Sequence, residues 1–197
     1  MTREYLKSIV AGALIGIGDI ALLVVENKYI AAVLFSVALL SIIELKLPLY
    51  TGRIGKVLQN KNAVDCLAYL FGNSCGCIAV NALGVAILTS FSSQIKAFDF
   101  ADAKYAKPFL TMFIAGILCN VLIHIAVTAK NEIITILCVM AFILCGFEHS
   151  IADVGFIIFT SGANLLITLL KWVLVVLGNT VGGVATEFLI YKKEKTA

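Results

Sequence analysis

The strongest constraint on this chain is its series of long apolar segments. Six of them run over residues 9–25, 30–45, 64–88, 109–129, 133–147 and 165–191. A helix needs about 20 largely apolar residues to cross the hydrocarbon core of a bilayer. Hydrophobic residues make up 61% of the 197 residues and charged residues 14%, and a soluble domain of this size could not bury so much apolar surface. We therefore expect an all-α integral membrane protein with six transmembrane helices in the lipid bilayer.

Basic residues near the ends of these segments indicate the orientation of the chain. Six crossings place both termini on one side, and cytoplasmic loops carry an excess of Lys and Arg. Nine basic residues fall on the side of the termini: Arg3, Lys7, Arg53, Lys56, Lys61, Lys130, Lys192, Lys193 and Lys195. Four fall on the opposite side: Lys28, Lys96, Lys104 and Lys107. We expect a multi-pass protein of the cell membrane with both termini in the cytoplasm.

Two short motifs recur at almost the same spacing. Residues 11–14 (AGAL) return as residues 115–118 (AGIL), 104 positions later, and residues 70–76 (LFGNSCG) return as residues 176–182 (VLGNTVG), 106 positions later. Three crossings per half is an odd number, so the two halves must face opposite ways in the membrane.

The recurring motifs give the chain its expected organisation. We predict a single transmembrane channel domain over residues 1–197, with repeat one at 1–90, an external loop at 91–107 and repeat two at 108–197. Chance similarity among Gly, Ala and Leu is the alternative, because these residues are common in membrane helices.

The middle segment of each half is predicted to be broken. In the first half, Pro48 removes a backbone donor and Gly52 permits unusual dihedral angles. In the second half, Glu148, His149 and Asp153 sit between two apolar stretches at membrane depth. Ionisable groups at that depth are functional candidates by default, and irregular backbone survives there only where it lines a cavity or is buried in protein. A polar turn at an interface is the alternative.

The two breaks also make an electrostatic prediction. Half-helices that begin near Thr51 and Ser150 would direct backbone N–H groups toward the centre of the membrane. Two opposed positive dipole ends favour an anion or an electron-rich neutral molecule between them.

Three motifs resemble the formate/nitrite transporter family. They are residues 146–152 (GFEHSIA), 116–120 (GILCN) and 177–183 (LGNTVGG). The resemblance extends over all six segments of this short chain. It implies an aquaporin-like pore fold and a pentameric channel for small monovalent anions, such as formate, nitrite or hydrosulfide, and their conjugate acids.

The resemblance also assigns roles to individual residues. It implies that His149 is the central pore histidine, that Thr51 faces it from the first broken helix, that Lys104 is the vestibule lysine and that Asn120 lies close to both. Four residues fall at or near the family's apolar constrictions, with ordinary packing as the alternative: Phe35, Leu39, Tyr50 and Phe142. The remaining residues are expected to structure the two loops: Glu148, Asp153, Gly52 and Arg53.

Three positions depart from the family pattern. Pro48 stands where the family has Glu, and Arg53 and Asp153 stand where it has Asn. Because these changes touch both loops that gate the pore, they leave the substrate open.

We expect Lys104 to draw an anion into the outer vestibule and His149, whose ordinary pKa is about 6.5, to exchange a proton with it. Thr51 and Asn120 would supply hydrogen bonds that replace lost water. One alternative is a pore for another small neutral or charged solute, with its selectivity reset by Arg53 and Asp153. A second is a membrane-embedded enzyme, and a third is a purely structural oligomer.

Other partners are not expected from the composition. A net charge of +3 spread along the chain makes no basic stripe, so we expect no nucleic-acid partner. The six cysteines lie in apolar spans and no spacing resembles a zinc site, so we expect no metal ion, no cofactor and no enzyme activity. His124 follows Asn120 by four residues and shares its helical face, where it either reaches the pore or is satisfied between helices.

Overall fold

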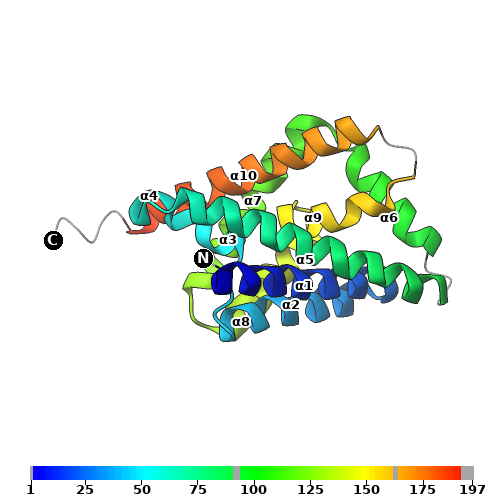
Figure 1. Cartoon of the computed structure of the whole chain (residues 1–197), viewed down its shortest axis with the longest axis horizontal. Coiled ribbons are helices and arrows are strands. Elements are labelled where there is room, and N and C mark those ends of the chain that lie inside the picture. The colour runs from blue at the N-terminus through cyan, green and yellow to red at the C-terminus, as the bar shows by residue number, and fades with distance from the viewer. Residues whose placement is uncertain (1, 91–93, 162–163, 192–197) are drawn as a thin grey trace.

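The computed structural model describes residues 2–90, 94–161 and 164–191, and within these ranges every regular element is a helix. The elements are α1 (Thr2–Val24), α2 (Lys28–Glu44), α3 (Tyr50–Arg53), the 3₁₀ helix η1 (Ile54–Lys56), α4 (Val57–Asn60), α5 (Ala63–Ser90), α6 (Gln94–Ala106), α7 (Phe109–Thr128), α8 (Glu132–Leu144), α9 (Ser150–Phe156), the 3₁₀ helix η2 (Ile157–Phe159) and α10 (Leu165–Tyr191) (Figure 1).

Four of these helices are long and apolar enough to cross a membrane. The qualifying stretches are Arg3–Val24, Ala63–Val85, Phe109–Thr128 and Leu165–Ile190. The second and fifth predicted segments form the shorter helices α2, of 17 residues, and α8, of 13 residues. The described part of the chain is therefore all-helical, with four candidate membrane spans.

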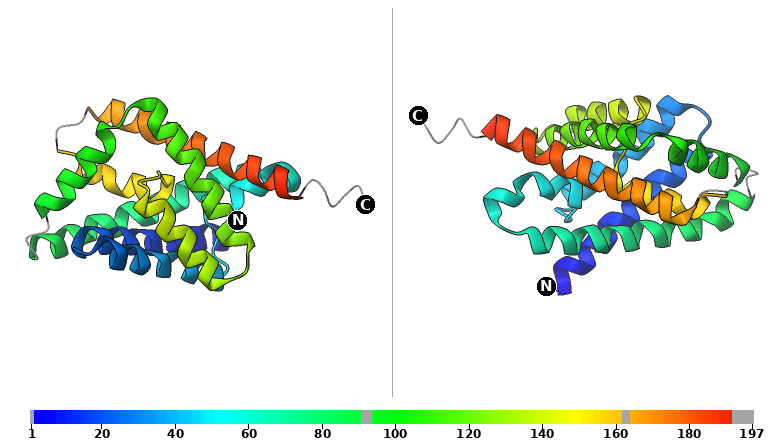
Figure 2. Two further views of the ribbon diagram at one scale, coloured as in Figure 1. Left: turned by 180° about the vertical axis from the view of Figure 1, so that it is seen from behind. Right: turned by 90° about the horizontal axis from the view of Figure 1, so that it is seen from above.

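The long helices pack in two pairs, α1 along α5 and α7 along α10 (Figures 1 and 2). Glycine permits the close approach in both pairs. A Cβ atom at Gly76 of α5 would lie 2.8 Å from the backbone nitrogen of Ala13 in α1. At Gly182 of α10 it would lie 3.0 Å from the carbonyl carbon of Ile117 in α7. Small residues at such contacts are typical of helices that pair in a membrane.

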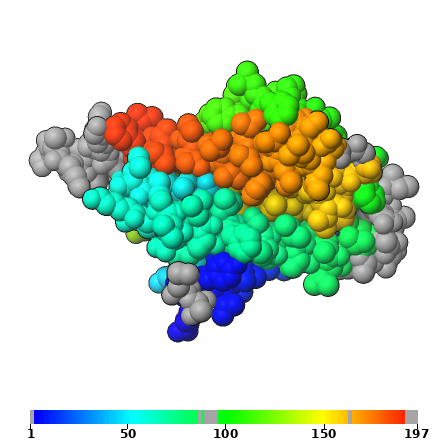
Figure 3. Space-filling model, turned by 45° about the horizontal axis from the view of Figure 1, so that its top comes forward, coloured from blue at the N-terminus to red at the C-terminus, as the bar shows by residue number. Residues whose placement is uncertain are grey.

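Large apolar side chains cover the outer surfaces of α5 and α10, which form broad bands across one face of the molecule (Figure 3). On α5, Leu67, Phe71 and Leu83 are exposed, and on α10, Leu166 and Leu189 are exposed. An exposed apolar surface of this extent is suited to contact with lipid or with another subunit rather than water.

Helical structure stops in the same way after α2 and after α8. The N–H of Leu47 donates to the carbonyl of Ile42 at 2.9 Å, and the N–H of Phe147 donates to the carbonyl of Phe142 at 2.9 Å. The preceding residue is left-handed in both cases, with a φ of 54° at Lys46 and 68° at Gly146. This pattern is the Schellman termination of a helix. It ends both helices before a short extended linker.

The connection predicted as an external loop at residues 91–107 contains a helix. Residues 94–106 of the predicted 91–107 segment form α6, while residues 91–93 lie outside the described residues. The helix forms because Ala97, Ala101 and Tyr105, spaced four apart, make one buried stripe. α6 packs against α5 and η2, and its Lys104 pairs with Asp153 of α9.

Candidate functional site

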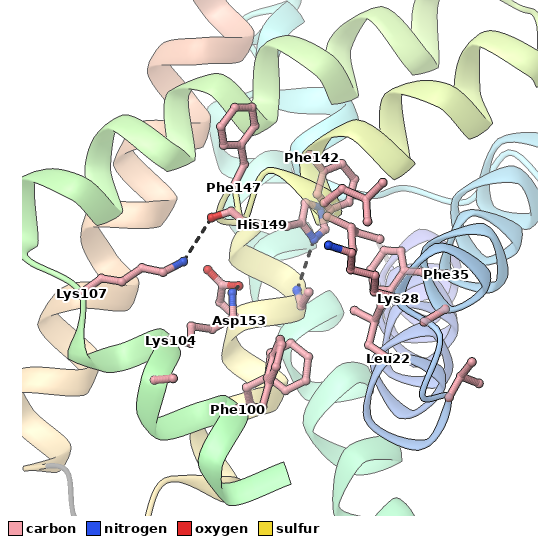
Figure 4. A pocket seen from close by; sticks show the side chains of 18 of the residues that line it. Leu22, Lys28, Phe35, Phe100, Lys104, Lys107, Phe142, Phe147, His149 and Asp153 are labelled. Atoms are coloured by element: carbon pink, nitrogen blue, oxygen red, sulfur yellow. Dashed lines mark hydrogen bonds and ion pairs between the residues drawn. The ribbon is translucent and has the colours of Figure 1, made fainter. Parts of the chain in front are cut away.

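A cavity of about 460 Å³ lies between α6, α8, α9 and the first turns of α2 (Figure 4). Its polar and charged lining consists of Glu26, Lys28, Lys104, Lys107, His149 and Asp153. Its aromatic lining consists of Phe35, Phe100, Phe142, Phe147 and Phe156. A mostly apolar cavity with a few converging polar groups is the usual form of a binding site for a small molecule.

His149 occupies the N-cap of α9 and is almost fully buried. Its Nδ1 accepts a hydrogen bond from the backbone N–H of Ala152 at 3.2 Å, and its Nε2 lies 2.9 Å from Oγ1 of Thr51 in α3. Because Nδ1 accepts a hydrogen bond from a backbone N–H, the neutral ring carries its proton on Nε2. This Nε2–H donates a hydrogen bond to the hydroxyl oxygen of Thr51. The two short helices α3 and α9 therefore meet through this pair of side chains.

Aromatic rings stack beside the histidine. The ring of Phe142 lies 5.9 Å from that of His149, with 25° between the planes. On its other side Phe142 meets Phe35 of α2 edge to face, also at 5.9 Å. The stack closes the wall of the cavity next to His149 with apolar surface.

Four charged side chains form a cluster beside the cavity. Lys104 of α6 pairs with the carboxylates of Glu148 and Asp153, the latter at 2.8 Å. Lys107 pairs with Glu148 at 2.5 Å and donates to the carbonyl of Gly146 at 3.1 Å. The side chains of Glu148 and Asp153 are 0% and 1% exposed, against 11% for Lys104 and 32% for Lys107. The two positive and two negative charges cancel.

The cluster fixes the charge of Lys104, which lies on α6 outside the four long apolar helices. Burial lowers the pKa of the Lys104 ammonium, but the attraction of Asp153 and Glu148 outweighs burial, and the pKa is raised above its ordinary value. Lys104 therefore stays positively charged across the physiological range of pH.

Two buried asparagines hold the starts of the short helices. Asn179 of α10 accepts from the N–H of Ser150 at 2.9 Å and donates to the carbonyls of Gly116 and Glu148 at 2.8 and 3.0 Å. Its hydrogen bonds join α7, the linker and α9, so they fix the position of His149 between them.

Asn73 of α5 has the corresponding role in the first half. It accepts from the N–H of Tyr50 at 2.7 Å and donates to the carbonyls of Ser8 and Pro48 at 2.7 and 3.0 Å. These bonds place α3, and with it Thr51, against α1 and α5.

The structure brings His149, Thr51, Phe35 and Phe142 together. It places Lys104 and Asp153 on the wall of one cavity, with Glu148 paired to Lys104 behind that wall. Other predicted site residues lie elsewhere. Asn120 donates to the backbone carbonyl of Asn179 at 2.7 Å, and Tyr50 contacts Thr180 at 2.7 Å between their hydroxyl oxygens.

The rest of the predicted set does not line the cavity either. Leu39 is buried in the hydrophobic core. Gly52 packs toward Val127 of α7, and Arg53 at the end of α3 is exposed.

Sequence reasoning did not single out Lys107, Asn73 or Asn179. The two asparagines carried a usable signal, because each follows a glycine in a motif that recurs at an offset of 106 positions. The sequence gives no signal for Lys107, because only the folded structure brings it next to Glu148.

His124 lies away from the cavity. Its Nε2 pairs with the Glu187 carboxylate of α10 at 2.8 Å, and both side chains are buried. His124 therefore lies between α7 and α10 rather than on the wall of the cavity, although neither ring nitrogen makes a hydrogen bond of good geometry.

The chain was compared with known families and structures. The model of the family described as "Formate/nitrite transporter" matches residues 1–192. A solved structure described as a pentameric formate channel with formate bound superposes with a TM-score of 0.82 at 21% identity, covering 100% of this chain and 98% of that one. A second, described as an FNT family ion channel, gives a TM-score of 0.82 at 23% identity, covering 96% and 89%. No curated protein matches.

These likenesses show that the chain has the fold of a membrane channel, and both solved structures are described as channels. Together with the four long apolar helices, they make the chain a multi-pass membrane protein. Because the family model covers nearly the whole sequence, the chain belongs to the formate/nitrite transporter family.

Proposed function

We propose that this protein is a channel for small monovalent anions of the formate, nitrite or hydrosulfide class, which pass as their conjugate acids after exchanging a proton at His149. Membership of the family and the structural likeness to a channel with formate bound support the class of solute. The observation that carries the proposal is His149 itself, a buried histidine at a helix start that borders the cavity and is held by Thr51.

Moving an anion from Lys104 past His149 has a high free-energy cost, because the anion loses its water of hydration. The wall next to His149 is formed by Phe35 and Phe142, which offer a charged solute no hydrogen bonds. Neutralising the anion removes most of this cost, because desolvation penalises a charged group far more than a neutral one. Lys104 supplies the positive charge that attracts the anion to this point.

The hydrogen bonds of His149 favour rapid proton exchange. A second proton on Nδ1 would turn this nitrogen from an acceptor into a donor and release the N–H of Ala152 from its cap. The protonated ring is therefore the less favourable state in the empty site. An anion in the cavity accepts the proton and restores the cap.

The same proposal includes the arrangement of the chain in the membrane. We infer six crossings in two inverted halves of a single domain, with α2–α3 and α8–α9 as the broken helices. The matching helix terminations and the matching bonds of Asn73 and Asn179 support it. The excess of basic residues near the termini supports a cytoplasmic location for both ends, although Lys192, Lys193 and Lys195 fall outside the described residues.

A pentamer of this chain in the cell membrane is part of the proposal. Its support is the likeness to a channel described as pentameric, together with the exposed apolar faces of α5 and α10.

The experiment is flux of radiolabelled formate into proteoliposomes across a pH series. Wild-type protein is expected to take up formate in a pH-dependent way, and His149→Ala to lose that dependence. His124→Gln is the matched control, because His124 is the only other histidine in the sequence and does not line the cavity. Unchanged pH-dependent uptake by His149→Ala would contradict the role of this residue.

A pore for a different small solute is the second candidate, and one observation favours it. Lys104 forms an ion pair with Asp153, so it already has a carboxylate partner. A panel of hydrosulfide, nitrite, acetate and ammonium in the same vesicles separates the candidates. Ammonium permeation without formate permeation would support this second reading.

A further inference from the structure

Asp153 places a carboxylate next to Lys104, the residue proposed to attract a carboxylate permeant. Its Oδ1 accepts from the Lys104 ammonium at 2.8 Å, and Asp153 lines the cavity. Lys104 also pairs with Glu148, so two carboxylates already converge on one ammonium. A formate anion that approaches Lys104 therefore meets an ammonium that is already paired with two carboxylates.

The second oxygen of Asp153 is unsatisfied. Oδ2 is buried and has no hydrogen-bond partner among the described residues. A buried oxygen of an ionised carboxylate without a donor is costly, whereas a carboxylic acid carries its own proton at that oxygen. The surroundings of Asp153 therefore suit two forms of its carboxyl group. The ionised form pairs with Lys104, and the protonated form is stable without that ion pair.

Several titratable groups face Asp153 from the helices packed around it. They are Lys104 and Tyr105 of α6, Glu148 of the linker, Asp19 of α1 and Cys119 of α7. Asp19 and Glu148 repel the ionised form of Asp153, and Lys104 stabilises it. The hydroxyl of Tyr105 donates to the backbone carbonyl of Asp153 at 2.7 Å and leaves the carboxylate untouched.

The charge of the cluster decides whether an anion is admitted. With Asp153 ionised, Lys104, Lys107, Glu148 and Asp153 sum to zero, and with Asp153 protonated they sum to one positive charge. A neutral cluster offers an anion little attraction to offset its lost hydration, while a positive cluster does.

We propose that the carboxylate of Asp153 competes with the permeant anion for the ammonium of Lys104. The anion can bind Lys104 only after Asp153 has taken up a proton. This inference rests on the proposed function and adds a specificity-determining residue to it. In the exchange, the protonated Asp153 releases Lys104, and the permeant carboxylate takes its place. The permeant then takes up its proton at His149 and continues as the neutral acid, while Asp153 releases its own proton to the aqueous side as it pairs with Lys104 again.

The test compares formate uptake by wild type and Asp153→Asn in proteoliposomes, measured over a range of formate anion concentrations at each pH of a series. For wild type, the half-saturating formate concentration is expected to fall as the pH is lowered. For Asp153→Asn, it is expected to be lower at neutral pH by about tenfold and to be nearly independent of pH, because one opposing unit charge has been removed. Asp99→Asn is the matched control, since Asp99 is an exposed acid on α6 that does not line the cavity.

The outcomes separate the two proposals. If wild type carries no formate at any pH, the proposed function is wrong. If wild type carries formate and Asp153→Asn keeps the wild-type half-saturation and pH profile, the inference about Asp153 alone is wrong. Size-exclusion chromatography verifies that the variant is folded. If it is not, a half-saturation of wild type that does not change with pH overturns the inference by itself.

Discussion

Asn73 and Asn179 make the same three hydrogen bonds on opposite sides of the site. Each accepts from the first N–H of a short helix and donates to the carbonyl two residues earlier. Each also donates to a carbonyl of a neighbouring long helix, α1 for Asn73 and α7 for Asn179. The two residues are 106 positions apart and occupy the same place in the motif that recurs at residues 70–76 and 176–182.

Replacing either asparagine is expected to destabilise the protein strongly. Asn179→Ala leaves the N–H of Ser150 without its acceptor and removes a donor from the carbonyls of Gly116 and Glu148. The cost is about 1–3 kcal/mol for each buried group left unpaired. Thermal unfolding in detergent measures the effect, and Asn60→Ala at an exposed position of α4 is the control. An unchanged melting temperature for Asn179→Ala would show that these bonds do not support the fold.

Thr51 is expected to contribute through its hydroxyl rather than its volume. Thr51→Val keeps the size of the side chain but leaves the Nε2–H of His149 without its acceptor, at a cost of about 1–3 kcal/mol. Formate uptake should fall by about tenfold, which corresponds to about 1.4 kcal/mol. Thr51→Ser, which retains the hydroxyl, should keep most of the uptake, and equal uptake by both variants would refute this role.

Phe142 is expected to limit the size of the solute. Phe142→Leu removes part of the stack between His149 and Phe35 without leaving a polar atom unpaired. The ratio of acetate to formate uptake should rise, because the wall of the cavity recedes. Phe71→Ala on the exposed face of α5 should leave the ratio unchanged. A ratio that stays constant in Phe142→Leu would place the constriction elsewhere.

Lys46 is expected to be a suboptimal residue for its backbone position. It takes a φ of 54° at the end of α2, where its counterpart Gly146 takes 68°. Left-handed backbone costs a residue with a Cβ roughly 1 kcal/mol. Lys46→Gly should therefore raise the melting temperature and Gly146→Ala should lower it. Lys46→Ala keeps the Cβ and should resemble wild type, which separates backbone strain from loss of the ammonium.

The positions of the long helices could be predicted from the sequence because bilayer crossing is decided by apolar length. The predicted segments at 64–88 and 109–129 correspond closely to α5 and α7. The interruption after α2 was also visible, because Pro48 cannot continue a helical hydrogen-bond ladder.

The details of the site were less predictable. The left-handed position of Lys46 had no signal, since lysine does not favour that conformation. The pairing of Lys107 with Glu148 joins residues 41 positions apart and depends on how α6 packs. The partner of Asp153 was equally hidden, because a departure from a family pattern indicates a change without saying what the new side chain contacts.

The frame around the site is built from backbone groups. The side chains of Asn73 and Asn179 bind the N–H and carbonyl groups of the short helices and their linkers, and they make no demand on which side chains those segments carry. Pro48, Arg53 and Asp153 can therefore replace other residues while α3 and α9 stay in place. In such an architecture the solute preference can evolve independently of the scaffold, so related channels are free to diverge in what they carry long before they diverge in shape.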